Sequence, residues 1–154
     1  MISSERQWLG AMPWDKVLEL NAAFCQTQRV PAKVHDPNCA AVKARWESAC
    51  SRTMTLEEAL EVCRQANLTG PFVFNNANTF ATVAKSLVDH WAKGLPPVEA
   101  TILRTTVSHY AADRVTKKEL VQVMRYLDPY LRPAAQAATV PAIPASTVIQ
   151  PGAV

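Results

Sequence analysis

The chain has 154 residues, of which 49% are apolar and 19% are charged, and its formal net charge at pH 7 is +3. This length and composition are typical of one globular domain with its own core. The small net charge gives little support for a dedicated DNA-binding domain, which usually has a larger basic excess. No apolar run reaches the roughly 18 to 20 residues of a membrane span, and the first residues lack the apolar core of a secretory signal. We therefore expect a cytoplasmic protein, or part of a particle assembled in the cytoplasm, that makes no membrane contact.

Helix-start and helix-stop residues divide the first 70 positions into three predicted helices. The first covers residues 13–29 and has a proline in its first turn. The second covers residues 36–51, with Asp36 as its N-cap. The third starts at a capping box formed by Thr55 and Glu58 and ends before a glycine and a proline. Their expected buried residues are Trp14, Val17, Leu18, Phe24 and Cys25, then Cys39, Val42, Trp46, Ala49 and Cys50, then Leu56, Ala59, Leu60 and Cys63.

Three more helices are predicted in the second half of the chain. The asparagine-rich segment 75–79 supplies N-caps for a fourth helix that ends at Gly94. Two prolines open a fifth helix, which runs to about Asp113, and a second capping box, Thr116 with Glu119, starts a sixth. No stretch alternates with period two for long enough to predict a sheet. The predicted fold is therefore all-α, a compact bundle of five or six helices within residues 1–132.

Residues 133–154, here called the C-terminal arm, differ in composition from the rest of the chain. They contain no charged side chain and four prolines. Proline interrupts helices and central strands, so the arm is expected to lie extended along another surface. Four apolar side chains are its predicted anchors on a partner: Val140, Ile143, Val148 and Ile149.

The sequence predicts no cofactor and no metal ion. No two of its four glycines are neighbours, so no glycine-rich phosphate loop is present. Cysteines are separated by gaps of about a dozen residues, unlike the close pairs of zinc sites. We expect the four cysteines to be small core residues in a reducing compartment. A Cys25–Cys39 disulfide is the alternative if the first two helices form an antiparallel hairpin.

Neither catalysis nor anion binding has a strong signal. His109 and Asp113 stand four residues apart on one predicted helix, a spacing that can orient an imidazole but also occurs in ordinary surface pairs. No serine or cysteine stands in a recognisable nucleophile motif. The asparagine-rich segment 75–79 could hold a small anion at a helix N-terminus, although capping also explains it. We therefore predict that the protein is not an enzyme.

Basic side chains indicate a second class of function, nucleic-acid binding. They gather in residues 29–52 and 104–132, with Trp46, Tyr126 and Tyr130 as aromatic neighbours. The predicted contacts are Lys43, Arg45, Arg52, Lys117, Lys118 and Arg125. Solvated helix faces and a core position for Trp46 explain the same pattern.

The expected function is inferred from the composition of the C-terminal arm. We expect a non-enzymatic interaction or assembly subunit of a larger complex, such as a phage or other particle component. Its partners are protein chains in a homo- or hetero-oligomer, with docking through the arm. The alternative is a basic helical accessory subunit that binds nucleic acid in a ribonucleoprotein or packaging complex.

Overall fold

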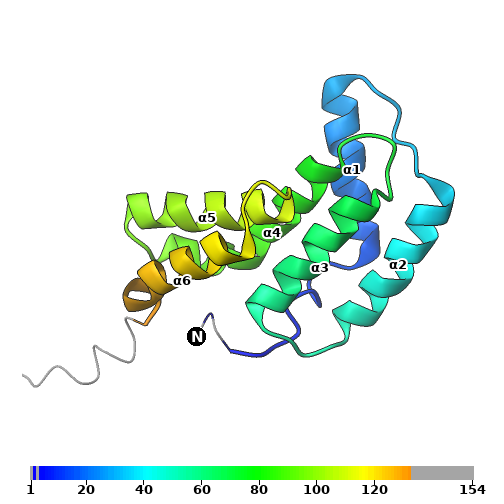
Figure 1. Ribbon diagram of the computed structural model, residues 1–154. Coiled ribbons are helices and arrows are strands. Elements are labelled where there is room, and N and C mark those ends of the chain that lie inside the picture. Colours follow the sequence, from blue (N-terminus) through cyan, green and yellow to red (C-terminus); the bar gives the residue numbers. More distant parts are fainter. Residues whose placement is uncertain (1, 3, 133–154) are drawn as a thin grey trace, which may run out of the picture.

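In a computed structural model, the part of the chain that the structure describes forms six α-helices joined by short connections (Figure 1). The structure describes residues 2 and 4–132. The helices are α1 (Trp14–Gln28), α2 (Asp36–Cys50), α3 (Leu56–Thr69), α4 (Asn76–Lys93), α5 (Pro97–Ala111) and α6 (Lys117–Leu131). In the described residues no strand forms, and extended pairing is limited to two isolated antiparallel bridges, Arg6 with Met54 and Val34 with Phe72. The predicted all-α fold is confirmed, with six helices.

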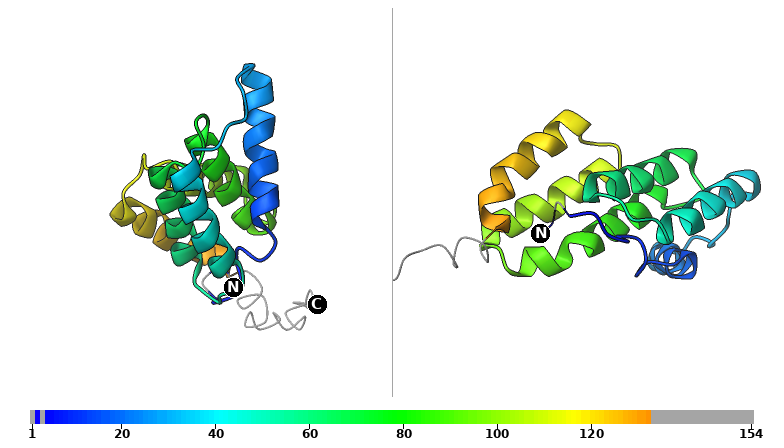
Figure 2. Two further views of the ribbon diagram at one scale, coloured as in Figure 1. Left: turned by 90° about the vertical axis from the view of Figure 1, so that its right-hand side faces the viewer. Right: turned by 90° about the horizontal axis from the view of Figure 1, so that it is seen from below.

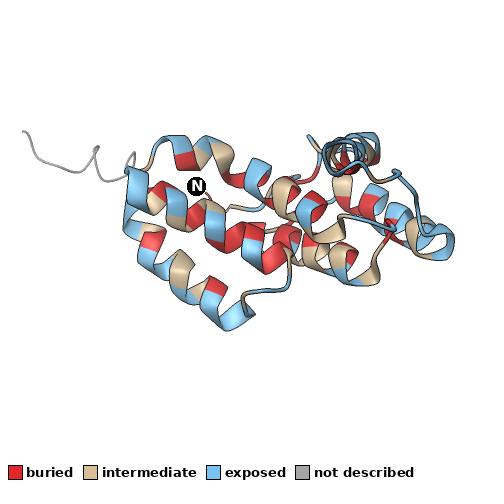
Figure 3. Ribbon diagram, turned by 90° about the horizontal axis from the view of Figure 1, so that it is seen from above, coloured by how far each residue is buried: buried red, intermediate tan, exposed pale blue. Residues whose placement is uncertain are grey.

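The helices pack around a central pair, α4 and α5. Helix α3 contacts both members of this pair, α6 packs on α5, and α1 packs on α4. Helix α2 lies beside α3, so α2 and α6 occupy opposite ends of the molecule (Figures 1 and 2). Buried and exposed positions alternate along the helices, as expected for amphipathic helices around one core (Figure 3). No helix among the described residues is both long enough and apolar enough to cross a membrane.

Both predicted capping boxes are present. The backbone N–H of Glu58 donates to Thr55 Oγ1 at 3.2 Å, and Thr55 N donates to Glu58 Oε2 at 2.8 Å. The same reciprocal pair joins Thr116 and Glu119 at 3.2 and 2.7 Å. Each box satisfies two backbone N–H groups that would otherwise be unpaired at the start of the helix. The starts of α3 and α6 are therefore fixed by local sequence.

The predicted N-cap of α2 is wrong by one residue. Asp36 is the first helical residue, and His35 is the N-cap, without a side-chain capping bond. The cause lies outside the helix, because the N–H of His35 donates to Pro71 O at 2.8 Å and the N–H of Val73 donates to Lys33 O at 2.9 Å. This contact with a distant segment sets where the helix begins.

A cluster of aromatic rings joins the first half of the core. Trp14, Trp46, Phe72 and Phe80 are all buried, and neighbouring ring centroids lie 5.6 to 6.2 Å apart. Trp46 is fully buried, and its Nε1 donates to Met12 O at 2.8 Å. The cluster therefore ties α1 and α2 to α4 and leaves no Trp46 surface for stacking on a base.

Two parts of the core have no sequence prediction. Trp8 and Leu9, ahead of α1, are buried, and the Arg6 guanidinium lies 4.8 Å from the ring centroids of both Trp8 and Trp91. Within α1, Asn21 is buried at a position where an apolar residue is expected. Phe24, which was predicted to lie in the core, is only partly buried. Asn21 Nδ2 donates to Phe74 O at 2.7 Å, so its burial is compensated.

Candidate functional site

The predicted arm anchors, Val140, Ile143, Val148 and Ile149, lie outside the described residues, and their role stays a prediction. The last described residue, Arg132, follows the end of α6. Leu131 and Arg132 line a hollow of about 480 Å³ between α3 and α6. Its other apolar lining residues are Ile2, Leu56, Leu60, Val121 and Met124. The last described residues of the chain therefore lie at the edge of a partly apolar hollow.

The six basic residues predicted to contact nucleic acid are all exposed, but they do not form one stripe. Three belong to α2 and the turn after it, and three to α6, at the other end of the molecule (Figure 1): Lys43, Arg45 and Arg52, then Lys117, Lys118 and Arg125. Lys43 Nζ lies 3.9 Å from Glu47 Oε1. Arg45 and Arg52 line one hollow, and Arg52 and Lys117 line another, of about 640 Å³.

That hollow is not strongly basic. Three glutamates, Glu57, Glu58 and Glu61, line it together with Arg52 and Lys117. Because these carboxylates line the same hollow as the two basic side chains, they oppose the approach of a phosphate backbone. Tyr126 and Tyr130 remain half-exposed, with ring centroids 6.1 Å apart.

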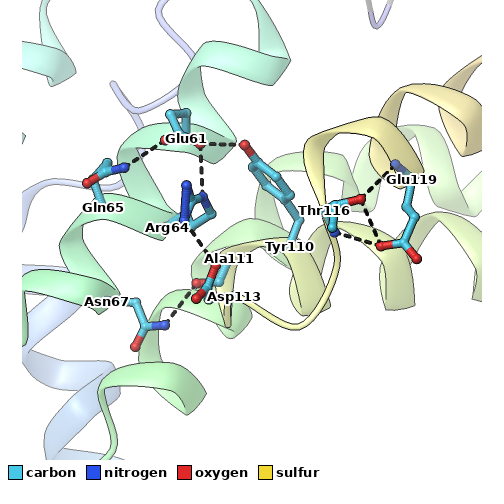
Figure 4. Close-up of polar contacts among 9 residues, drawn as sticks. All are labelled: Glu61, Arg64, Gln65, Asn67, Tyr110, Ala111, Asp113, Thr116 and Glu119. Atoms are coloured by element: carbon cyan, nitrogen blue, oxygen red, sulfur yellow. Dashed lines mark hydrogen bonds and ion pairs between the residues drawn. The ribbon is translucent and has the colours of Figure 1, made fainter.

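A polar cluster joins α3 to the end of α5 (Figure 4). The Tyr110 hydroxyl donates to Glu61 Oε2, Gln65 Nε2 donates to Glu61 Oε1 at 2.8 Å, and Arg64 Nε lies 3.2 Å from Glu61 Oε2. Arg64 Nη1 in turn contacts Asp113 Oδ1 at 3.0 Å. The side chains that meet here come from positions 49 residues apart in the chain. The cluster therefore fixes the position of α5 against α3.

The pKa values in this cluster follow from its contacts. Burial alone would raise the pKa of the Glu61 carboxyl, but hydrogen bonds from Gln65, Tyr110 and Arg64 lower it overall. Burial, and then the neighbouring Glu61 carboxylate, raise the pKa of Tyr110. At neutral pH the cluster therefore holds an ionised Glu61 against a protonated Tyr110, which suits a structural contact.

The pair of His109 and Asp113 that the four-residue spacing allowed is not formed. Helix α5 ends at Ala111, and Asp113 has a left-handed backbone with φ of 60°. The helical i,i+4 geometry is therefore absent, and the Asp113 carboxylate contacts Arg64. His109 is exposed and is not oriented by that carboxylate.

The asparagine-rich segment closes a turn. Asn76 donates from Nδ2 to Phe72 O at 2.8 Å and accepts from Phe72 N at 3.0 Å. Asn78 Nδ2 donates to Asn75 Oδ1 at 3.0 Å, and Thr79 Oγ1 donates to Asn75 O at 2.7 Å. The predicted N-cap bond to α4 is absent at Asn75, whose φ is 65°. These side chains serve the backbone of the turn, which leaves few of their groups for an anion.

All four cysteines are free thiols, so the predicted Cys25–Cys39 alternative is not formed. Cys25 is buried, and its Sγ donates to Asn21 Oδ1 at 3.7 Å. Burial raises the pKa of the Cys63 thiol to about 12, which makes it a poor nucleophile and metal ligand. Among the residues that the structure describes, no group of three or more metal-ligating side chains comes together.

The groove between α2 and α3 is a surface that sequence reasoning missed. It has a volume of about 550 Å³, and its lining includes the buried residues Val42, Trp46, Ala49 and Ala66. Arg45 and Arg52 stand on its α2 side, and Glu61 and Gln65 on its α3 side. We call it the α2–α3 groove. Comparisons with protein-family models, with curated proteins and with solved structures find no match for this chain.

Proposed function

We propose that the protein is a non-enzymatic interaction or assembly subunit of a larger complex, such as a phage or other particle component. The observation that supports this proposal is a core that already extends from Ile2 to Leu131 and includes residues of all six helices. The uncharged arm with its apolar residues follows directly after this core. Its proposed role is to dock on a neighbouring chain through these apolar residues.

The uncharged, partly apolar composition of the arm is more typical of a segment that docks on another protein than of a solvated tail. Fully extended, 22 residues reach up to about 70 Å, which is enough to cross a neighbouring subunit. Prolines restrict the unbound chain and so reduce the entropy lost on binding. The four anchors, Val140, Ile143, Val148 and Ile149, then insert into apolar hollows of the partner. The contact needs no charged pair.

Light scattering coupled to size-exclusion chromatography tests the proposal. The full chain is compared with a full-length variant in which all four anchors are serine, and with a chain shortened after Arg132. Val98→Ser is the matched control, because Val98 is an apolar residue of the helical body that is 65% exposed. Circular dichroism verifies that each variant keeps its helices.

The expected result is a defined oligomer for the full chain and for Val98→Ser, and a folded monomer for both arm variants. A full chain that stays monomeric over the whole concentration range contradicts self-assembly through the arm. An oligomer that survives the four serine substitutions contradicts the assigned anchors.

The alternative, a basic accessory subunit that binds nucleic acid in a ribonucleoprotein or packaging complex, has one favourable feature. Lys118 and Arg125 are both exposed and stand seven residues apart, on the same side of α6. Binding through them would weaken steeply with salt. Titration of single-stranded RNA and duplex DNA at several salt concentrations, with Lys118→Gln/Arg125→Gln as the variant, measures this directly.

A further inference from the structure

The α2–α3 groove runs along two helices that have opposite directions. Asn38, near the start of α2, donates from Nδ2 to Thr69 O at the end of α3 at 2.9 Å. The groove is lined from Val42 to Arg52 along α2 and its following turn, about 15 Å at 1.5 Å per residue. An open groove of this length between two helices matches the way proteins bind an amphipathic helix.

Small residues on the groove walls allow close approach. Ala44 and Ser48 on α2 are exposed, and Ala49 and Ala66, which line the same groove, are buried. A docked helix therefore meets short side chains, and its own apolar residues can reach the groove floor. Val62, partly buried on α3, adds a further apolar contact.

The charges around the groove define the partner. Arg45 is exposed and, within the described part of the chain, makes no ion pair, whereas the neighbouring Lys43 pairs with Glu47. Arg52 also makes no ion pair within the described residues, although Glu57 and Glu58 line the same 640 Å³ hollow as Arg52. On the opposite wall Glu61 is already bonded to Tyr110, Gln65 and Arg64. The uncommitted charge on the groove is thus positive, and Arg45, unlike Arg52, does not line the hollow that contains Glu57 and Glu58.

We propose that the α2–α3 groove binds an amphipathic helix of a partner protein, with its apolar face on Val42, Ala49, Val62 and Ala66 and with a carboxylate facing Arg45. The arm of a second copy fits less well, because it has no acidic residue to meet Arg45 and its four prolines disfavour a continuous amphipathic helix. This inference rests on the proposed assembly role and adds a second surface to it.

The probe is a phage-displayed library built on an alanine-rich helix in which one face is randomised, selected against the full-length protein. We expect enriched sequences to combine apolar residues at i, i+3/i+4 spacing with a flanking Asp or Glu. Arg45→Glu weakens their binding by roughly tenfold or more, the effect of reversing one close charge pair. Replacing the acidic residue of the peptide by lysine restores binding to Arg45→Glu. Ser48→Trp, an exposed substitution that fills the groove, also abolishes binding.

Lys43→Glu is the matched control, because Lys43 is exposed on the same helix but does not line the groove, and it leaves binding unchanged. Absence of enriched peptides, enrichment without acidic residues, or binding that tolerates Arg45→Glu and Ser48→Trp overturns the inference. Light scattering on the same Arg45→Glu protein keeps the two proposals separate. Loss of peptide binding with an intact oligomer locates the effect in the groove, whereas a monomeric wild type that still binds peptide contradicts only docking through the arm.

Discussion

The Tyr110–Glu61 hydrogen bond gives a quantitative test of how α3 and α5 are held together. Tyr110 is 2% exposed, whereas the Glu61 side chain is 39% exposed. Hydrogen bonds to charged groups usually contribute about 1.5–3 kcal/mol to stability. Because water can reach Glu61 once the hydroxyl is removed, we expect Tyr110→Phe to lower the free energy of unfolding by only about 1 kcal/mol.

Urea unfolding of the wild type, Tyr110→Phe, Glu61→Gln and the double variant measures the coupling between the two side chains. We expect a coupling free energy of about 0.5–1 kcal/mol and a Tm for Tyr110→Phe about 3 °C lower. Tyr126→Phe is the control, because Tyr126 is 52% exposed and its contact with Glu99 is 3.4 Å long. A coupling near zero, or an equal loss in Tyr126→Phe, refutes this account of the cluster.

The same contact makes stability depend on pH. The pKa of Glu61 is lowered from its ordinary value of 4.5, so the folded protein binds the proton less tightly than the unfolded chain. The stabilisation is therefore present above about pH 4.5 and is lost as pH falls through the folded pKa. Urea unfolding between pH 6 and 3, roughly the range around an ordinary carboxyl pKa, should show a shallower acid loss in Tyr110→Phe. Equal acid slopes would contradict the role of the hydroxyl.

Three further predictions follow from the core and the caps. Because burial raises the pKa of Cys63 from 9.0 to about 12, its contribution to stability is present below pH 9 and falls as pH rises towards 12. Between pH 8 and about pH 10, the loss of stability measured by urea unfolding should be larger in the wild type than in Cys63→Ala by roughly 1 kcal/mol, because the variant lacks this thiol. Thr116→Ala should cost about 1 kcal/mol by removing the cap of α6, and an unchanged urea midpoint would contradict this. Ellman's reagent at neutral pH should label the partly exposed Cys39 and Cys50 and reach the two buried thiols only after unfolding.

The sequence predicted those parts of the fold that short-range interactions determine. Capping boxes at Thr55 and Thr116 involve residues three apart, so their signal is complete within four positions. The prediction failed where the partner is distant in the chain. Asn21 is buried because Phe74 O accepts its amide, and the α2 start shifted because His35 pairs with Pro71.

The candidate surfaces show the same contrast between features set by nearby residues and features set by distant ones. Exposure of the six basic residues could be predicted from helix periodicity, and the structure confirms it. The groove beside Arg45 could not, because it exists only once α2 packs beside α3. Asp113 illustrates the converse error: its spacing from His109 implied a helical pair, but the helix ends before it and Arg64 takes the carboxylate.

The distribution of charge separates the proposed functions better than the net charge does. Several basic side chains are already paired: Lys43 with Glu47, Arg64 with Glu61 and Asp113, Lys93 and Arg104 with Asp89, and Arg132 with Asp128. Paired cations contribute less to phosphate binding, because a carboxylate competes for each one. Docking of the uncharged arm should resist sodium chloride and strengthen in sulfate, since it depends on apolar burial. Binding of an acidic helix at Arg45 should weaken moderately with salt, and nucleic-acid binding should weaken steeply. A single salt series on assembly, peptide binding and nucleic-acid binding thus assigns each interaction to its surface.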